Sequence, residues 1–143
     1  MSRLLQIAFV FFFAFAASAQ TLRIQILDGK TGKPVANEHV NLYRGSDSKD
    51  LTGNSFIRNF VTDRDGVITT TDIDRDTKTV GVAVSWHRPC LKEFRWQWFS
   101  LSEVFSSGLV SENSCKPTVE KVAPPGTLIF FVREETFFEK MAH

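Results

Sequence analysis

Apolar and polar residues alternate along much of the chain with a period of two. Residues 22–27 (LRIQIL) place Leu22, Ile24 and Ile26 on one side, with polar residues between them. A period of two is typical of a β-strand with one buried face. Similar alternation, or a short apolar run between turn residues, occurs at residues 40–43, 60–62, 67–71, 79–86, 94–99 and 128–132. The pattern therefore predicts six or seven short strands.

Glycine, proline and aspartate separate these segments. Residues 28–34 (DGKTGKP) hold two glycines and a proline, which predicts a loop. Residues 63–66 (DRDG) place a glycine where a tight turn needs positive φ, so we expect a hairpin that joins residues 60–62 to residues 67–71. The stretch 45–59 is rich in Ser, Asp, Asn and Gly and predicts a polar surface loop.

Only residues 100–108 have a helical pattern. Leu101, Val104 and Phe105 share one face at helical spacing, a serine at the start can cap the helix, and Gly108 can end it. Short strands at this spacing with one short helix predict an all-β sandwich. Residues 134–143 predict a charged tail that carries two phenylalanines.

The last predicted strand, residues 128–132, contains two adjacent phenylalanines. Phe130 and Phe131 are consecutive, and consecutive strand residues point to opposite faces of a sheet. Both phenylalanines therefore cannot enter one core. We expect one of them to be covered by the helix, by the tail or by a partner.

The N-terminus differs in composition from the rest of the chain. Residues 4–17 are apolar except for Gln6 and hold five of the fourteen phenylalanines, Arg3 precedes them, and Ala17-Ser18-Ala19 stands at their end. These are the three parts of a secretory signal peptide. The apolar run is shorter than the roughly 20 residues that span a bilayer as a helix, which argues against an uncleaved anchor. We expect residues 1–19 to be a signal peptide and residues 20–143 to be one secreted or periplasmic domain without membrane insertion.

Charge excludes one large class of partners. Arg3 accounts for the formal net charge of +1, so residues 20–143 are formally neutral. Nucleic acids and anionic lipids are bound by clustered lysines and arginines, whereas the basic residues of this chain are scattered singly. We therefore expect no nucleic-acid partner.

Cys90 and Cys115 are the two cysteines of the chain. In an oxidising compartment two cysteines most simply form a disulfide. In the chain-entropy model, closing this loop would stabilise the folded state by roughly 3–4 kcal/mol. The alternative is a reactive thiol at Cys90 paired with His87, three residues upstream.

Two short motifs resemble a known family. Residues 26–37 (ILDGKTGKPVAN) followed by residues 40–43 (VNLY) resemble the opening of carboxypeptidase-regulatory-like domains, and residues 62–67 (TDRDGV) resemble a hairpin of the same family. The resemblance covers about residues 21–86. It implies a prealbumin-like (transthyretin-like) β-sandwich. Together with the strand and helix patterns above, it leads us to expect a prealbumin-like or Ig-like β-sandwich of about six to seven strands with one short helix. It also implies an accessory or adhesion-type module rather than a catalytic unit.

The same opening is similar to that of transthyretin and 5-hydroxyisourate hydrolase, which gives the alternative of a small exported hydrolase. That enzyme needs a histidine in its first strand, where this chain has Gln25. Its C-terminal Tyr-Arg-Gly-Ser occurs here only in the interior, as residues 43–46. The histidines show no metal-ligand spacing and no nucleophile motif is present, so we name no catalytic residue and expect no cofactor.

Asp63, Asp65 and Asp72 are weak candidates for a metal site. With Val61 at position one, they fall at positions three, five and twelve of an EF-hand-type calcium loop. Position one is apolar, however, and the flanking segments have strand patterns. We favour a turn and a solvated loop with no bound metal.

Trp86, Trp96 and Trp98 are the candidate ligand-binding residues. Trp86 continues the parity of Val80, Val82 and Val84, and Trp96 and Trp98 share one side of residues 94–99 with Phe94. Such a row of rings fills the sandwich core, the interpretation that we favour, or forms an exposed binding face.

We expect an exported, non-catalytic binding or interaction module with an unidentified protein or glycan as its partner. Alternatives are the hydrolase described above and a carbohydrate-binding accessory domain that uses exposed tryptophans.

Overall fold

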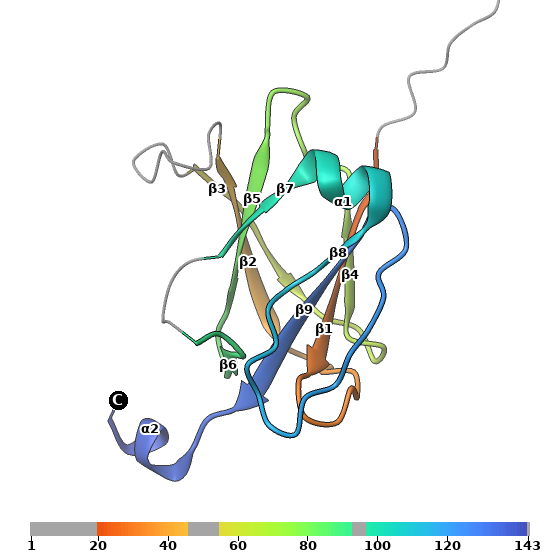
Figure 1. The fold of residues 1–143 in the computed structure, drawn as a ribbon. Coiled ribbons are helices and arrows are strands. Elements are labelled where there is room, and N and C mark those ends of the chain that lie inside the picture. The colour runs from red at the N-terminus through yellow and green to blue at the C-terminus, as the bar shows by residue number, and fades with distance from the viewer. Residues whose placement is uncertain (1–19, 46–54, 93–96, 143) are drawn as a thin grey trace, which may run out of the picture.

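A computed structural model describes residues 20–45, 55–92 and 97–142. The described residues form an all-β sandwich of two sheets with two short helices (Figure 1). The predicted signal peptide, residues 1–19, lies outside the described residues and stays a prediction. None of the described helices is long and apolar enough to cross a membrane.

Sheet A has the strand order β4-β1-β9-β6, and β8 pairs with β9. Its two central strands, β1 and β9, run parallel, with Ile24 opposite Leu128 and Ile26 opposite Phe130. The N-terminal and C-terminal parts of the domain therefore lie side by side in the middle of one sheet (Figure 1). The strands of sheet A are β1 (Leu22–Asp28), β4 (Val67–Thr70), β6 (His87–Pro89), β8 (Leu109–Val110) and β9 (Thr127–Glu134).

Sheet B is antiparallel and has the order β3-β2-β5-β7. Its strands are β2 (His39–Gly45), β3 (Ser55–Val61), β5 (Thr79–Val84) and β7 (Trp98–Ser100). Alternate residues of these strands pack against sheet A, as the sequence predicts. Val40, Leu42, Val80 and Phe99 are almost completely buried in the core between the sheets.

Helix α1 (Leu101–Ser107) confirms the predicted helix together with both of its ends. The Ser100 side chain accepts a hydrogen bond from the backbone N–H of Glu103, and Gly108 ends the helix with a φ of 73°. Leu101 and Val104 are the buried residues of the helix and join the core between the sheets. The predicted tail contains a second helix, α2 (Phe137–Met141).

The predicted hairpin at residues 63–66 is wrong. β3 pairs with β2 in sheet B, whereas β4 pairs with β1 in sheet A, so the turn carries the chain from one sheet to the other. Its local chemistry is as expected, because Gly66 has a φ of 72° and the Asp63 carboxylate accepts hydrogen bonds from the N–H groups of Asp65 and Val67. A turn of this kind fits either connection, and the partner strands decide between them. The predicted loop at residues 45–59 is also too long, since β3 begins at Ser55.

A second apolar cluster lies on the outer side of sheet A. Leu27, Ile129 and Phe131 point away from the sandwich core and pack against Ala123 and the disulfide between Cys90 and Cys115. Phe130 is 1% exposed in the first core and Phe131 is 1% exposed in this second cluster. The segment between β8 and β9, which carries Cys115 and Ala123, therefore covers Phe131, the phenylalanine that does not enter the sandwich core. We call it the covering segment.

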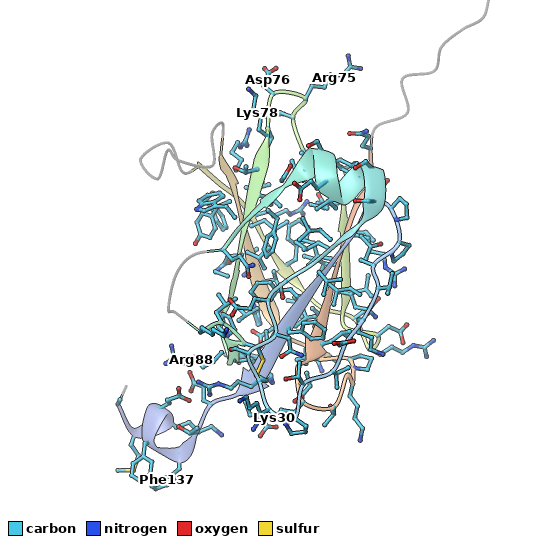
Figure 2. The ribbon with its side chains drawn as sticks, viewed as in Figure 1. Lys30, Arg75, Asp76, Lys78, Arg88 and Phe137 are labelled. Carbon is cyan, nitrogen blue, oxygen red and sulfur yellow. A yellow bond between two sulfur atoms is a disulfide. The ribbon has the colours of Figure 1, made fainter. Side chains whose placement is uncertain are left out.

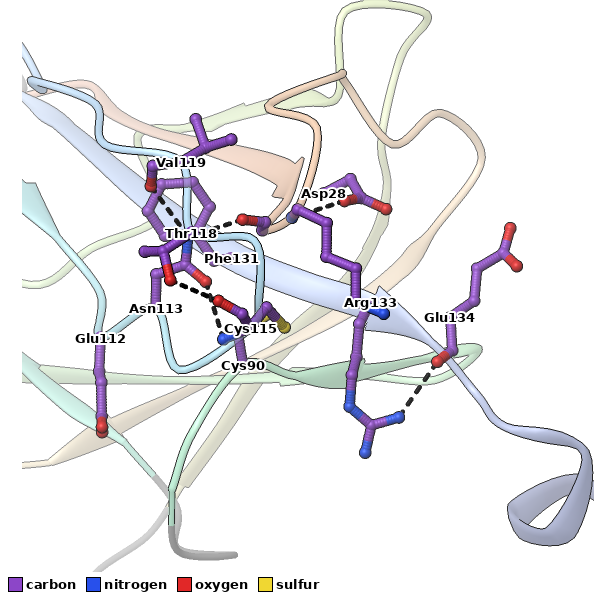
Figure 3. Close-up of a disulfide and its surroundings, with 12 residues drawn as sticks. Asp28, Cys90, Glu112, Asn113, Cys115, Thr118, Val119, Phe131, Arg133 and Glu134 are labelled. Atoms are coloured by element: carbon purple, nitrogen blue, oxygen red, sulfur yellow. Dashed lines mark hydrogen bonds between the residues drawn. A yellow bond between two sulfur atoms is a disulfide. The ribbon is translucent and has the colours of Figure 1, made fainter.

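Hydrogen bonds hold the covering segment in place (Figure 3). Asn113 donates from Nδ2 to the carbonyl oxygens of Gly29 and Val119, at 2.8 and 2.9 Å, and its Oδ1 accepts from the N–H of Cys115. Thr118 donates to the carbonyl oxygen of Cys115 at 2.6 Å. The predicted disulfide is confirmed, and the alternative of a free Cys90 thiol paired with His87 is wrong.

Replacing both Cys90 and Cys115 by serine should lower the free energy of unfolding by about 3–4 kcal/mol, because the bridge closes a loop with a sequence separation of 25. Urea denaturation followed by circular dichroism measures the loss. The exposed Ser102→Ala variant is the control and should change stability by less than about 0.5 kcal/mol. An unchanged urea midpoint in the double variant would contradict the proposed contribution of the covering segment.

Candidate functional site

The outer side of sheet B is arranged differently from that of sheet A. On the outer side of sheet A, Phe131 is 1% exposed beneath the covering segment, whereas on the outer side of sheet B Phe56 is 55% exposed. We call this surface the open face. By strand register and burial it comprises His39, Asn41 and Tyr43 of β2, Phe56, Asn59 and Val61 of β3, Gly81 and Ala83 of β5, and Trp98 of β7, with Trp86 at its border.

Aromatic rings lie at both ends of the open face. At one end the indole of Trp86 is 61% exposed, and its centroid lies 4.8 Å from that of the His39 ring. At the other end the rings of Tyr43 and Phe56 meet edge-on with centroids 5.7 Å apart. His39 and Tyr43 are four residues apart on β2, which corresponds to roughly 13 Å along the strand.

Two asparagines occupy the middle of the open face. Asn59 donates from its side-chain nitrogen to the side-chain oxygen of Asn41 at 2.6 Å. The Asn59 side-chain oxygen lies 3.3 Å from Nδ1 of His39, so the three side chains form one hydrogen-bonded row. Because each primary amide has two donors and an oxygen with two lone pairs, these contacts leave hydrogen-bonding capacity for a ligand.

Trp98 lies against the small residues of the sheet. A Cβ placed on Gly81 would come within 3.0 Å of the Trp98 ring, and one on Gly45 within 3.3 Å. Any residue larger than glycine at position 81 would therefore push the indole away from the strand. The ring is half-buried on the open face, and Phe99, which has the opposite parity, fills the core instead.

Glu38 fixes the position of Trp86. The Glu38 side chain is fully buried, and its Oε1 accepts hydrogen bonds from the backbone N–H groups of Ser85 and Trp86, both at 3.0 Å. Its Oε2 contacts Nδ1 of His87. Because His87 belongs to β6 in sheet A and Glu38 directly precedes β2 in sheet B, this carboxylate joins the two sheets where the chain crosses between them.

The backbone of Glu38 is held as well. Its N–H donates to the hydroxyl of Thr62 at 2.9 Å, and that hydroxyl donates to the carbonyl oxygen of Val35 at 2.7 Å. The N–H of Thr62 in turn donates to the carbonyl oxygen of Glu38 at 2.9 Å. Hydrogen bonds between residues that are distant in the sequence therefore stabilise Glu38, which positions Trp86 at the border of the open face.

The core interpretation of the tryptophans is wrong for Trp86 and for Trp98. β5 ends at Val84, and the Glu38 carboxylate takes the next two N–H groups, so the parity of the valines does not extend to Trp86. Trp98 lies on the opposite side of sheet B from the core, against Gly81. Trp96 and Phe94 lie outside the described residues.

The three aspartates proposed as weak metal candidates lie in different local environments. Asp63 accepts from the N–H groups of its own turn, as described above. Asp65 is exposed in that turn, and Asp72 lies 3.2 Å from Nη1 of Arg58. Among the residues that the structure describes, no group of three His, Cys, Asp or Glu side chains is placed to hold a metal ion.

The residues behind the hydrolase alternative lie within the sheets. Gln25 is in β1, and its side chain donates to the carbonyl oxygen of Asp65 at 3.3 Å. Tyr43, Arg44 and Gly45 are in β2, which lies between β3 and β5 in sheet B. The contacts of Gln25 are those of a residue that supports the neighbouring turn.

Sequence reasoning missed Glu38, Asn41, Asn59 and Phe56. Nothing near Glu38 in the sequence indicates that its partners are residues 85–87, because the contact depends on two strand crossings. Asn59 and Phe56 fall in the stretch that composition assigned to a loop. The strand parity of Asn41 did place it on the side opposite Val40 and Leu42, which was the one available signal.

Helix α2 carries a second set of exposed apolar side chains. It extends beyond the end of the sandwich, and Phe137 lies at its far side (Figure 2). Phe138 is 82% exposed, and Phe137 and Met141 are nearly as accessible. Arg133 holds the helix through two hydrogen bonds to the Glu139 carboxylate, at 2.8 and 2.9 Å. The open face differs from this helix in the hydrogen-bonded row of His39, Asn41 and Asn59 beside its aromatic rings.

Known proteins resemble the chain only distantly. No model of a protein family matches it, and no curated protein matches it in sequence. The shaft pilin SpaA from Lactobacillus rhamnosus GG is similar in structure, with a TM-score of 0.47 and 10% identity over 82% of this chain and 52% of the pilin. This chain thus spans about half the length of the pilin. A 9R-lipoxygenase from Cyanothece PCC8801 has a TM-score of 0.37 and 14% identity over 78% of this chain and 16% of that protein. Similarities at these values carry no conclusion about function.

Glu38→Ala should lower the free energy of unfolding by about 3–5 kcal/mol, because it leaves two backbone N–H groups and the His87 ring without their acceptor. Glu38→Gln should cost less, since its remaining oxygen can still accept from Ser85 and Trp86. Urea denaturation measures both. Glu120→Ala, at an exposed glutamate, is the control, and equal midpoints for Glu38→Ala and this control would refute the role assigned to Glu38.

Helix α2 should stay docked as the pH falls. The hydrogen bonds from Arg133 hold the pKa of Glu139 well below its usual range, with a further contribution from the backbone N–H of Thr136. A lowered pKa in the folded state means that the stabilisation is present above the ordinary glutamate pKa of about 4.3 and is lost only as pH falls through the lowered value.

Amide signals of α2 in ¹⁵N NMR spectra therefore should not change as the pH passes through that ordinary range. In Glu139→Gln they should show a frayed helix already at neutral pH, while the exposed Glu134→Gln control should behave like the wild type. A wild-type transition near the ordinary glutamate pKa would contradict the role of the Arg133 contact.

Proposed function

We propose that the chain is an exported, non-catalytic binding module of the carboxypeptidase-regulatory-like type, and that it contacts its partner through the open face. The observation that supports this most is the contrast between the two outer sides of the sandwich. A disulfide-linked segment buries Phe131 on sheet A, whereas Trp86 and Phe56 are more than half exposed on sheet B. Exposed aromatic rings held in fixed positions give a large contact area at a small cost in conformational entropy.

The family assignment is supported by how the motif residues are used. Residues 28–34 form the turn after β1, where Gly32 has a φ of 72° and the Asp28 carboxylate accepts from the N–H groups of Lys30 and Thr31. The second motif forms the crossing from β3 to β4. The first motif thus has the turn chemistry that the resemblance implies, and the second has the same local chemistry but connects the two sheets instead of closing a hairpin.

Export is supported by two features that are independent of each other. The first is the signal-peptide pattern of residues 1–19. The second is the disulfide between Cys90 and Cys115, a bond that persists in oxidising compartments and is rare in the cytosol. A non-catalytic role is supported by the Glu38–His87 pair, since Glu38 is fully buried and its oxygens are used to hold the β5–β6 crossing.

Hydroxyl-radical footprinting tests the binding face while the partner is still unidentified. The protein is oxidised in the native cells that export it and, separately, after purification. Trp86 and Phe56 should be oxidised less in the native setting, because a partner covers them, whereas Phe138 on α2 serves as the internal control and should be oxidised equally. Equal oxidation of all three residues in both settings would contradict the proposal.

A further inference from the structure

The open face has a polar pair of side chains between two aromatic pairs, and this order indicates which class of ligand fits the face. The Asn41–Asn59 pair lies between the Trp86–His39 pair and the Tyr43–Phe56 pair. Protein interfaces have the opposite arrangement, with an apolar centre that excludes water and a polar rim. A flat protein partner would bury the two amides at the centre, where any unmatched hydrogen-bonding group costs free energy.

The open face is also neutral. The positions that comprise it hold no Asp, Glu, Lys or Arg. Opposite Asn41 the sheet carries only the methyl group of Ala83, whereas Gly81, opposite Tyr43, is buried beneath the Trp98 ring. A neutral surface gives an anionic ligand no counter-charge. The ligand that fits is therefore itself neutral.

A carbohydrate chain matches this arrangement of groups. A pyranose ring presents C–H groups on its faces, which pack on aromatic rings, and hydroxyl groups at its rim, which both donate and accept hydrogen bonds. The roughly 13 Å between the two aromatic pairs allows one chain to contact both pairs and the amides between them. We infer that the open face binds a neutral oligosaccharide, with rings stacked at the Trp86 end and the Phe56 end and hydroxyls bonded to Asn41 and Asn59.

This inference rests on the proposed function, because it names the ligand class of the same face. Glu38 acts in it as a positioning residue. By accepting the N–H groups of Ser85 and Trp86 it keeps the indole at a fixed place beside His39 before any ligand arrives. Preorganisation of this kind lowers the entropy that binding costs.

Affinity electrophoresis tests the ligand class with defined probes. Residues 20–143 are run in native gels that contain hydroxyethylcellulose, arabinoxylan, soluble starch or β-mannan, with alginate as an anionic control. At least one neutral polysaccharide should retard the protein, and alginate should not. The dependence of mobility on polysaccharide concentration gives the affinity.

Two variants separate a glycan from an apolar partner. Trp86→Ala should weaken the affinity about fivefold or more through loss of a stacking platform. Asn59→Leu should weaken it to a similar degree, because a hydroxyl loses its amide partner, although the same change would favour an apolar protein surface. Phe138→Ala, at an aromatic residue that is even more exposed to solvent but lies on α2, should leave the affinity unchanged. Urea midpoints establish that all three variants are folded.

Absence of retardation in every neutral gel would overturn the inference, as would equal affinities of the wild type and the Trp86 and Asn59 variants. If the footprint shows protection of Trp86 and Phe56 while no neutral polysaccharide binds, the ligand class is wrong and the binding face stands. If neither experiment shows an effect, both proposals fail.

Discussion

The buried carboxylate of Glu38 is the interaction on which the open face depends. It accepts two backbone N–H groups and contacts the His87 ring at the point where the chain leaves sheet B for sheet A. A buried acceptor of this kind is costly unless it is fully used, and here each oxygen has a partner. The result is that β5 ends at Val84, the chain turns, and the Trp86 indole is held at the surface beside His39.

The two outer sides of the sandwich solve the same packing problem in different ways. Parallel pairing of β1 and β9 places Phe130 in the core and Phe131 on the far side of sheet A, so that side needs a cover. The segment linked through the disulfide supplies it. The outward positions of sheet B hold small, amide and aromatic side chains together with Val61, and this side stays accessible, with Phe56 and Trp86 more than half exposed. A single chain thus obtains a second small core on one side and an accessible surface on the other.

The residue pattern correctly predicted those elements whose structure is decided by residues close together in the sequence. The strand parity of residues 22–27, the capped helix after Ser100 and the disulfide are all confirmed. The errors arise where a distant residue decides the outcome. The turn at residues 63–66 has the same chemistry in a hairpin and in a crossing between sheets, and Trp86 leaves the valine face because Glu38 ends the strand. The candidate site was predicted only through its tryptophans, since the pairing of Asn41 with Asn59 appears only once β2 and β3 are aligned.

Binding of a neutral sugar to the open face is tested most directly by NMR mapping of side-chain N–H groups during titration with cellohexaose, xylohexaose, maltohexaose or mannohexaose. The signals of the Trp86 indole N–H and of the Asn41 and Asn59 side-chain amides should shift together with one of these sugars, while the backbone amides of α2 should not move. Shifts confined to α2, or no shift of the three open-face groups with any of the four sugars, would contradict sugar binding at the open face.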